Sequence, residues 1–159
     1  KVATTKYCND KSEITTWTGA QQNFASRNRI YPNNSITNAA PIMTCPTASD
    51  IYNLNVGLMT SDEVVFAGGI YNSVSTQKYY LVKSNITTPS CWWTMAPGYW
   101  ESTGSLRQEI VDIDMGYMGS WGIELYCGVR PVISLDDNAI VTTSSPTSRG
   151  TSSNPYIVE

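Results

Sequence analysis

The sequence predicts an α+β fold with short strands, short helices and long loops. Its 159 residues suffice for one domain with a sizeable core, and we expect residues 1–159 to form a single domain. Only 14% of the residues are charged, and Ser, Thr and Asn carry much of the polarity. Such a composition suits strands and turns more than helices. One short stretch nevertheless has complete helix signals, so both kinds of element are expected.

The clearest helix signal lies in residues 57–69. Thr60 and Glu63 have the spacing of a capping box, in which each side chain satisfies a free amide of the first helical turn. Val64 begins an apolar side, and Gly68-Gly69 provides a stop. The predicted helix has about two turns, so it must pack on a core to persist.

Weaker signals predict the other elements. Residues 1–8 alternate loosely as in an edge strand, and residues 20–29 predict a short helix. Pro97-Gly98 predicts a turn, and the glycines that follow make residues 98–127 an expected irregular stretch. Further strands are expected at residues 79–82, 92–95, 109–115, 129–135, 140–143 and 156–158.

The four cysteines indicate an oxidising compartment. They show no CxxC spacing and the chain has no histidine, so disulfides are favoured over a zinc site or free buried thiols. Of three possible connectivities we favour Cys8–Cys45 and Cys91–Cys127. The first would close an N-terminal loop with little core of its own, and the second would staple the two ends of residues 98–127. Each bond would contribute roughly 4 kcal/mol by chain-entropy reasoning.

Charge and hydropathy limit the partners. The net charge is −3 and no basic cluster is present, which argues against nucleic acid and against an anionic membrane surface. No apolar run is long enough to span a bilayer. Because the chain begins at Lys1 without a visible signal peptide, we expect an ectodomain whose targeting or anchoring segment has been removed.

Residues 98–127 are the candidate ligand-binding surface. Tyr and Trp offer a large amphipathic area at low entropic cost, and carboxylates accept hydrogen bonds from sugar hydroxyls. The alternative is that Trp100 and Trp121 fill a small core. The predicted ligand-contacting residues are Tyr99, Trp100, Glu101, Arg107, Glu109, Asp112, Asp114, Tyr117, Trp121, Glu124 and Tyr126.

Trp92, Trp93 and Arg130 are assigned to the scaffold. Arg130 falls in the expected strand 129–135, which looks buried, and a buried arginine needs a carboxylate. We predict Asp62 or Glu63 as that partner. The functional alternative is that Arg130 recognises an anion.

Catalysis is not expected. Without histidine, a Ser-His-Asp or Cys-His arrangement is excluded. Asp112 and Asp114 would lie roughly 7 Å apart on a strand, which suits an inverting glycosidase but is common on solvent faces. Residues 136–138 suit a calcium site, because Asp136, Asp137 and Asn138 supply oxygen ligands; the alternative there is a plain turn.

Several sequence blocks resemble those of one bacterial family. Residues 57–69 resemble its GLITADEV…AGG block, residues 93–97 its YWTMSP block, residues 128–135 its GVRPVINL block and residues 150–158 its GTSSNPYVV block. Residues 7–11 and Cys45 also resemble its upstream pieces. The blocks follow one another in the right order over nearly the whole chain.

The family is a poorly characterised domain of surface proteins from gut Firmicutes, many of which carry a prepilin-type helix. The resemblance implies a C-type-lectin-like fold with twisted antiparallel sheets, similar to formylglycine-generating enzymes and to the variable proteins of diversity-generating retroelements. Residues 98–127 lie where the variable segment of such proteins would be. The enzymes hold copper with two neighbouring cysteines, and Cys127 has no close second thiol in the sequence.

We therefore expect a secreted, non-catalytic adhesin or receptor domain at the bacterial cell surface or pilus, where it would form a pilin-like head. It would bind a protein or glycan ligand through residues 98–127 and would reach the membrane only through the missing N-terminal anchor. The alternative is a structural pilin or surface-filament subunit that uses the same segment to pack against its neighbours.

Overall fold

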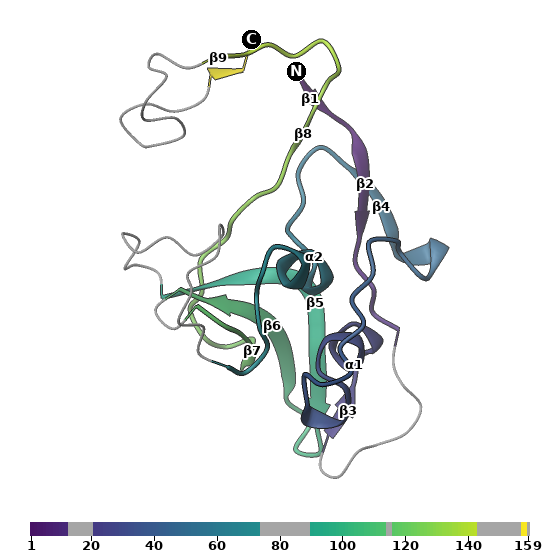
Figure 1. The fold of residues 1–159 in the computed structure, drawn as a ribbon, viewed down its shortest axis with the longest axis vertical. Helices are drawn as coiled ribbons and strands as arrows, with labels where there is room; N and C mark the ends of the chain where they lie inside the picture. The colour runs from purple at the N-terminus through teal and green to yellow at the C-terminus, as the bar shows by residue number, and fades with distance from the viewer. Residues whose placement is uncertain (13–20, 74–89, 114–115, 143–156, 159) are drawn as a thin grey trace.

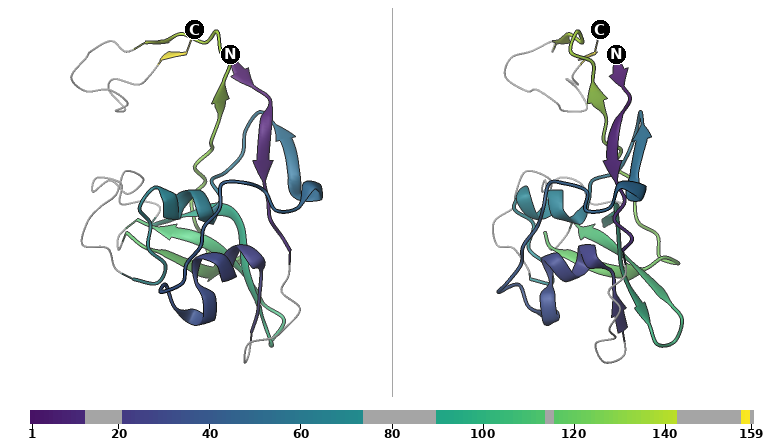
Figure 2. Two further views of the ribbon diagram at one scale, coloured as in Figure 1. Left: turned by 45° about the vertical axis from the view of Figure 1, so that its right-hand side comes forward. Right: turned by 90° about the vertical axis from the view of Figure 1, so that its right-hand side faces the viewer.

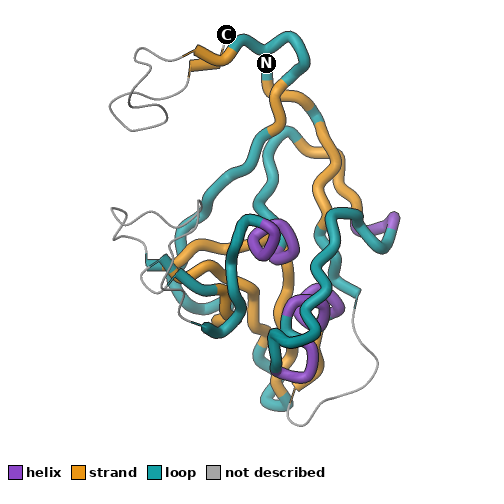
Figure 3. Tube along the Cα trace, viewed as in Figure 1, coloured by secondary structure: helices purple, strands orange, loops and turns teal. Residues whose placement is uncertain are grey.

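The computed structural model has a mixed α+β architecture with mostly antiparallel strands, as the sequence predicts (Figures 1 and 3). It describes residues 1–12, 21–73, 90–113, 116–142 and 157–158. The elements in chain order are β1 Val2–Ala3, β2 Thr5–Cys8, β3 Gln21–Asn23, α1 Ala25–Ile30, the 3₁₀ turns η1 Pro32–Asn34 and η2 Ala48–Asp50, β4 Ile51–Leu54, α2 Ser61–Phe66, β5 Cys91–Glu101, β6 Leu106–Asp112, β7 Met118–Gly122, β8 Ser134–Leu135, β9 Val141–Thr142 and β10 Ile157–Val158.

The largest sheet among the described residues has four antiparallel strands in the order β3-β5-β6-β7. Both helices lie on the same side of it (Figure 2). We call the side that α1 and α2 cover the inner face and the opposite side the outer face. Since residues that oppose one another on neighbouring strands share a face, the register of this sheet assigns each side chain to one of the two.

The hydrophobic core lies between the inner face and the two helices. Trp92, Val111 and Met118 oppose one another on β5, β6 and β7 and are almost completely buried. They pack with Ile30 of α1 and Val64 of α2. A helix of six residues has little stability alone, so this packing is what holds α1 and α2 in place.

The predicted capping box of α2 is confirmed. The Thr60 hydroxyl accepts a hydrogen bond from the Glu63 amide at 3.1 Å, and the Glu63 carboxylate accepts one from the Thr60 amide at 2.7 Å. Gly68 has a φ of 107°, a left-handed conformation that favours glycine where the helix ends. The local sequence therefore determines where this helix starts and stops.

Most of the expected strands are present. Residues 1–8 contain β1 and β2, and the two expected C-terminal strands correspond to β9 and β10. The helix expected at residues 20–29 is shorter and later than predicted, because residues 21–23 pair with β5 as strand β3. The strand expected at residues 79–82 lies outside the described residues.

The expected turn at Pro97-Gly98 is wrong, and the described part of residues 98–127 is irregular only outside β5, β6 and β7. Pro97 and Gly98 lie inside β5, at a point where its register with β6 shifts. Proline has no amide to donate, so a strand tolerates it where the ladder is interrupted. The chain then forms β6 and β7, and Gly119 and Gly122 lie in β7 rather than in loops.

The expected buried strand at residues 129–135 is also wrong. Only Ser134–Leu135 forms a strand, and it pairs with β1 in an arm that extends away from the four-stranded sheet (Figure 1). Val129 is 66% exposed and Ile133 is 45% exposed. The apolar run suggested burial, but it leaves the core after Gly128, whose backbone is bonded to β5.

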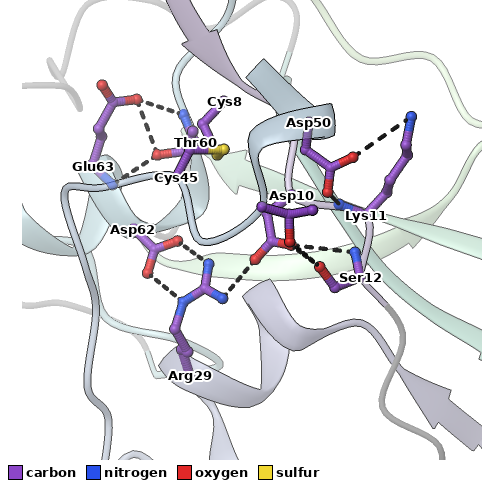
Figure 4. Close-up of a disulfide and its surroundings, with 11 residues drawn as sticks. Cys8, Asp10, Lys11, Ser12, Arg29, Cys45, Asp50, Thr60, Asp62 and Glu63 are labelled. Carbon is purple, nitrogen blue, oxygen red and sulfur yellow. Dashed lines mark hydrogen bonds and ion pairs between the residues drawn. A yellow bond between two sulfur atoms is a disulfide. The ribbon is translucent and has the colours of Figure 1, made fainter.

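An ion network joins the chain just after β2 to both helices (Figure 4). Arg29 of α1 binds Asp62 of α2 with two nitrogens, at 3.2 and 2.8 Å, and binds Asp10 at 2.6 Å. Both carboxylates are buried. Burial raises the pKa of Asp10, but hydrogen bonds from Ser12 and Arg29 and the charge of Arg29 outweigh it, so the pKa lies below its ordinary value.

The network corrects the predicted partner of Arg130. Asp62 binds Arg29, and the Glu63 carboxylate is bonded to Thr60 in the capping box. Arg130 is half-buried, and its guanidinium lies 5.2 Å from the centre of the Trp92 ring, a cation–π distance. The predicted pairing of Arg130 with Asp62 or Glu63 is thus wrong: the carboxylate of Asp62 binds the partly buried Arg29 instead.

The favoured disulfide connectivity is confirmed. Cys8 is bonded to Cys45, beside the ion network, and Cys91 is bonded to Cys127 (Figure 4 shows the first). The second disulfide joins the start of β5 to the chain that follows β7. Two disulfides are typical of a secreted or extracellular protein.

Replacing Arg29 should destabilise the fold strongly. In Arg29→Met, two buried carboxylates lose their counter-charge, which costs about 3–5 kcal/mol of unfolding free energy in chemical denaturation at pH 7. The contribution of Asp10 is present above pH 3.8 and disappears as the pH falls through its lower folded-state pKa. The matched control is Arg107→Met, whose partly exposed pair with Glu101 is worth about 0–1 kcal/mol. Equal losses in the two variants would contradict the assignment.

Removing the Cys91–Cys127 disulfide should also destabilise the domain. The double variant Cys91→Ser/Cys127→Ser releases a loop closed at a sequence separation of 36, which corresponds to about 4 kcal/mol of unfolding free energy. Denaturation of the oxidised double variant and the oxidised wild type measures this difference. An unchanged midpoint would show that the bond does not constrain the unfolded chain.

Candidate functional site

The outer face of the sheet carries two of the predicted ligand-contacting aromatic residues. Trp100 on β5 opposes Leu106 on β6, and Gln108 on β6 opposes Trp121 on β7. Since Leu106 and Gln108 are two residues apart on one strand, all four side chains lie on the same face. All four are half-buried, so the two indoles are neither sealed in the core nor fully in solvent.

A groove of about 440 Å³ lies on this part of the sheet. Trp100, Leu106 and Gln108 line it together with Asn9, Lys11, Phe24, Met95 and Pro97. We call these eight residues the outer-face groove. Its lining combines aromatic and aliphatic surface with a few polar groups, which is the usual composition of a small-ligand site.

The polar groups of the outer-face groove are held in place. The Gln108 side-chain amide donates to the carbonyl oxygens of Thr94 at 2.9 Å and Ala96 at 2.8 Å. These carbonyls lie between Trp93 and Pro97, where the register of β5 with β6 shifts, and the amide gives them a hydrogen-bond donor there. Lys11 donates to the Tyr52 hydroxyl at 2.8 Å, which raises the pKa of Lys11. The groove therefore offers oriented hydrogen-bonding groups beside an aromatic ring.

Three other predicted contact residues lie on the inner face, near the edge of the sheet. Tyr99 opposes Arg107, and the Arg107 guanidinium donates to the Glu101 carboxylate at 2.9 Å. That bond raises the pKa of Arg107. The Tyr99 ring lies 4.6 Å from the guanidinium of Arg27 in α1. These side chains thus contact helix α1 or one another, and they do not share a face with Trp100.

Glu109 is fully buried and belongs to a polar cluster on the inner face. The hydroxyls of Ser120 and Tyr71 donate to its Oε1 at 2.7 and 3.2 Å, and the Arg27 Nε lies 3.8 Å away. Burial raises the pKa of Glu109 to about 7 against the opposing effects of Ser120, Arg27 and Tyr71. Burial and the charge of Glu109 raise the pKa of Tyr71 as well. The expected exposure of Glu109 is wrong.

The remaining predicted contacts are scattered. Asp112 at the end of β6 is only 4% exposed, so its expected exposure is wrong too. Tyr117 is half-buried, and burial raises its pKa. Glu124 and Tyr126 are exposed in the chain after β7, and Asp114 lies outside the described residues. Whether any of these side chains contacts a ligand stays a prediction.

The residues predicted for calcium form the turn that was the alternative. The amide of Ala139 donates to the carbonyl oxygen of Asp136 at 2.8 Å. Within the described part of the chain, no three His, Cys, Asp or Glu side chains are placed to hold a metal ion. Calcium binding by Asp136, Asp137 and Asn138 stays a prediction.

Sequence reasoning missed most of the groove. Gln108, Leu106 and Met95 were not selected, and Asn9, Lys11 and Phe24 come from a distant part of the chain. A signal for the first two was available. Gly104, with a φ of 86°, ends a short turn between two runs that alternate like strands. A hairpin there would have placed Leu106 and Gln108 on the same face as Trp100.

No family model, curated protein or solved structure matches this chain. The family resemblance drawn from the sequence blocks therefore stays a prediction. None of the helices in the described residues has the length and apolar character needed to cross a bilayer.

Proposed function

We propose that this chain is a non-catalytic ligand-binding domain of the cell exterior, and that the outer-face groove is its binding site. The observation that carries the proposal is the combination in that groove of a half-buried indole, Trp100, with a side-chain amide, Gln108, fixed by two backbone carbonyls. The ligand is a glycan or a protein segment that stacks on the indole and bonds to the amide.

The chemistry of the groove supports this ligand class. Indole rings provide a large contact area with little rotamer freedom to lose, and they are common at binding hot spots. Because both Nε2 protons of Gln108 are bonded within the protein, its Oε1 remains as an acceptor with a fixed direction. A sugar hydroxyl or a peptide amide is a suitable donor to such an oxygen.

The rigidity of the site supports the same proposal. Trp100 and Gln108 lie on paired strands, and the Cys91–Cys127 disulfide closes the segment that contains them. Side chains on a rigid support lose little freedom when a ligand binds. We further propose that the fold is C-type-lectin-like and that residues 98–127 form the segment that varies among related surface proteins, with pilin-like heads as the setting.

Trp100→Ala tests the proposal. We expect binding to immobilised glycans or host-surface proteins to weaken at least tenfold, because the main stacking surface of the groove is lost. Trp121→Ala should weaken binding less, because Trp121 shares the face of Gln108 but does not line the groove. The control is Phe66→Ala at the end of α2, whose side chain is 56% exposed and outside the groove. Undiminished binding by a folded Trp100→Ala variant would contradict the proposal.

A second candidate function is that of a structural subunit in a surface filament. The arm formed by β1, β4, β8 and their flanking residues favours it, because aliphatic side chains are exposed there: Val2, Leu54, Val56, Ile133 and Leu135. Exposed apolar side chains gathered on one part of a surface are typical of protein contacts. In this function the arm and residues 98–127 pack against neighbouring copies.

Assembly distinguishes the two candidate functions. If the domain is a filament subunit, sedimentation velocity should show concentration-dependent association, and Ile133→Ser should reduce it because a 45% exposed apolar contact becomes polar. Trp100→Ala and Trp121→Ala should impair assembly as well. A strictly monomeric wild-type domain that binds glycan or protein in the Trp100-dependent way supports the first function and argues against the second.

A further inference from the structure

Glu109 connects three parts of the inner face through one carboxylate oxygen. Its Oε1 accepts hydrogen bonds from the hydroxyls of Ser120 on β7 and of Tyr71 in the chain after α2. The same oxygen lies 3.8 Å from the Nε of Arg27 in α1. Gly98 on β5 approaches the same oxygen so closely that a Cβ on it would lie 2.8 Å away. The second oxygen, Oε2, is buried without a hydrogen-bond partner in the described structure.

The charges around Glu109 come from few groups. Among the described residues, the titratable or charged side chains that face it are Arg27 and Tyr71, while β7 and β5 present the uncharged Ser120 and Gly98. Arg27 is itself held by Asn23, whose Oδ1 accepts at 2.6 Å, and by the rings of Tyr31, Tyr71 and Tyr99. Arg27 therefore keeps partners when Glu109 is neutral, but its attraction to the sheet weakens.

The residue that precedes helix α1 lines the outer-face groove. This residue is Phe24, the N-cap of α1, and its amide donates to the Gly98 carbonyl at 3.1 Å. Ser26 donates to the Pro97 carbonyl at 3.0 Å. Since Arg27 lies only three residues after the N-cap residue Phe24, a change in how Arg27 contacts Glu109 has a short path along the chain to the groove.

We propose that Glu109 is a proton-operated switch that sets how α1 docks on the inner face, and with it the position of the Phe24 wall of the groove. As a carboxylate, Glu109 accepts from both hydroxyls and attracts Arg27. As a neutral acid it can carry its proton on Oε2, which has no partner in the described structure, while Oε1 keeps accepting from the hydroxyls; the attraction to Arg27 is then lost.

The electrostatics of the site support a switch at neutral pH. Because burial raises the pKa of Glu109 from 4.5 to about 7, the folded protein binds a proton that the unfolded chain releases between these values. Stability contributed by this group is therefore complete below pH 4.5 and is lost as the pH rises through about 7. Coupling of the switch to ligand affinity rests on the proposed function, whereas the movement of α1 does not.

The switch can be tested without any ligand. In ¹³C-labelled protein titrated from pH 5 to 9, the Glu109 carboxyl carbon, the Phe24 ring and the α1 amides should shift with one midpoint near 7. Glu109→Gln should abolish the common midpoint at Phe24 and flatten the loss of stability with rising pH. The matched control, Glu101→Gln, removes a partly exposed carboxylate of the same sheet and should leave the midpoint in place.

Two results would overturn the switch: a Glu109 carboxyl midpoint near 4.5, or shifts of Phe24 and α1 that persist unchanged in Glu109→Gln. If that variant does not fold, the wild-type titration alone decides, because Glu109 and Phe24 must share a midpoint. Failure of the proposed function would appear instead as a lack of Trp100-dependent binding, with this titration intact.

Discussion

One guanidinium group, that of Arg29, connects both helices and the N-terminal chain. Arg29 binds a carboxylate from the N-terminal chain, Asp10, and another from helix α2, Asp62, while its own helix packs on the sheet. Each of the two helices has only six residues. Neither can persist without tertiary contacts, and the ion network fixes their mutual position in a way that apolar packing, which lacks direction, does not. The Cys8–Cys45 disulfide beside the network fixes the same region covalently.

Adjacent side chains of β6 point to opposite faces of the sheet and have different environments. Gln108 faces outward into the groove, and Glu109, the next residue, faces inward to a buried cluster. Two adjacent residues thereby connect the proposed binding site with the packing of α1. A buried carboxylate is costly to keep, and the cluster of hydroxyl and guanidinium groups around it reduces that cost without removing it. The inner face is therefore the less tolerant side of the sheet.

The sequence was sufficient where the deciding interactions are local or covalent. The boundaries of α2 followed from Thr60, Glu63 and Gly68, and the favoured disulfide pairing followed from the two segments that most needed to be closed. It was insufficient where the partner lies far along the chain. Nothing in the sequence near Arg130 shows that Asp62 binds Arg29. The alternation of residues along β6 likewise does not show that helix α1 covers the face of β6 that carries Arg107 and Glu109. The bulge at Pro97 likewise depends on Gln108, which a turn rule applied to Pro-Gly does not consider.

The hairpin tip between β5 and β6 has a particular place in this arrangement. Gly104 there has open space around the position of a Cβ, and its amide bonds only to the turn itself. The two ends of residues 98–127 are both held in place, one by the pairing of β5 with β3 and the other by the disulfide at Cys127. Added length at the tip would extend into solvent without pulling on either anchor. Evolution or an engineer could thus lengthen the rim beside the groove by insertion and reshape recognition there, while the surrounding architecture stays as it is.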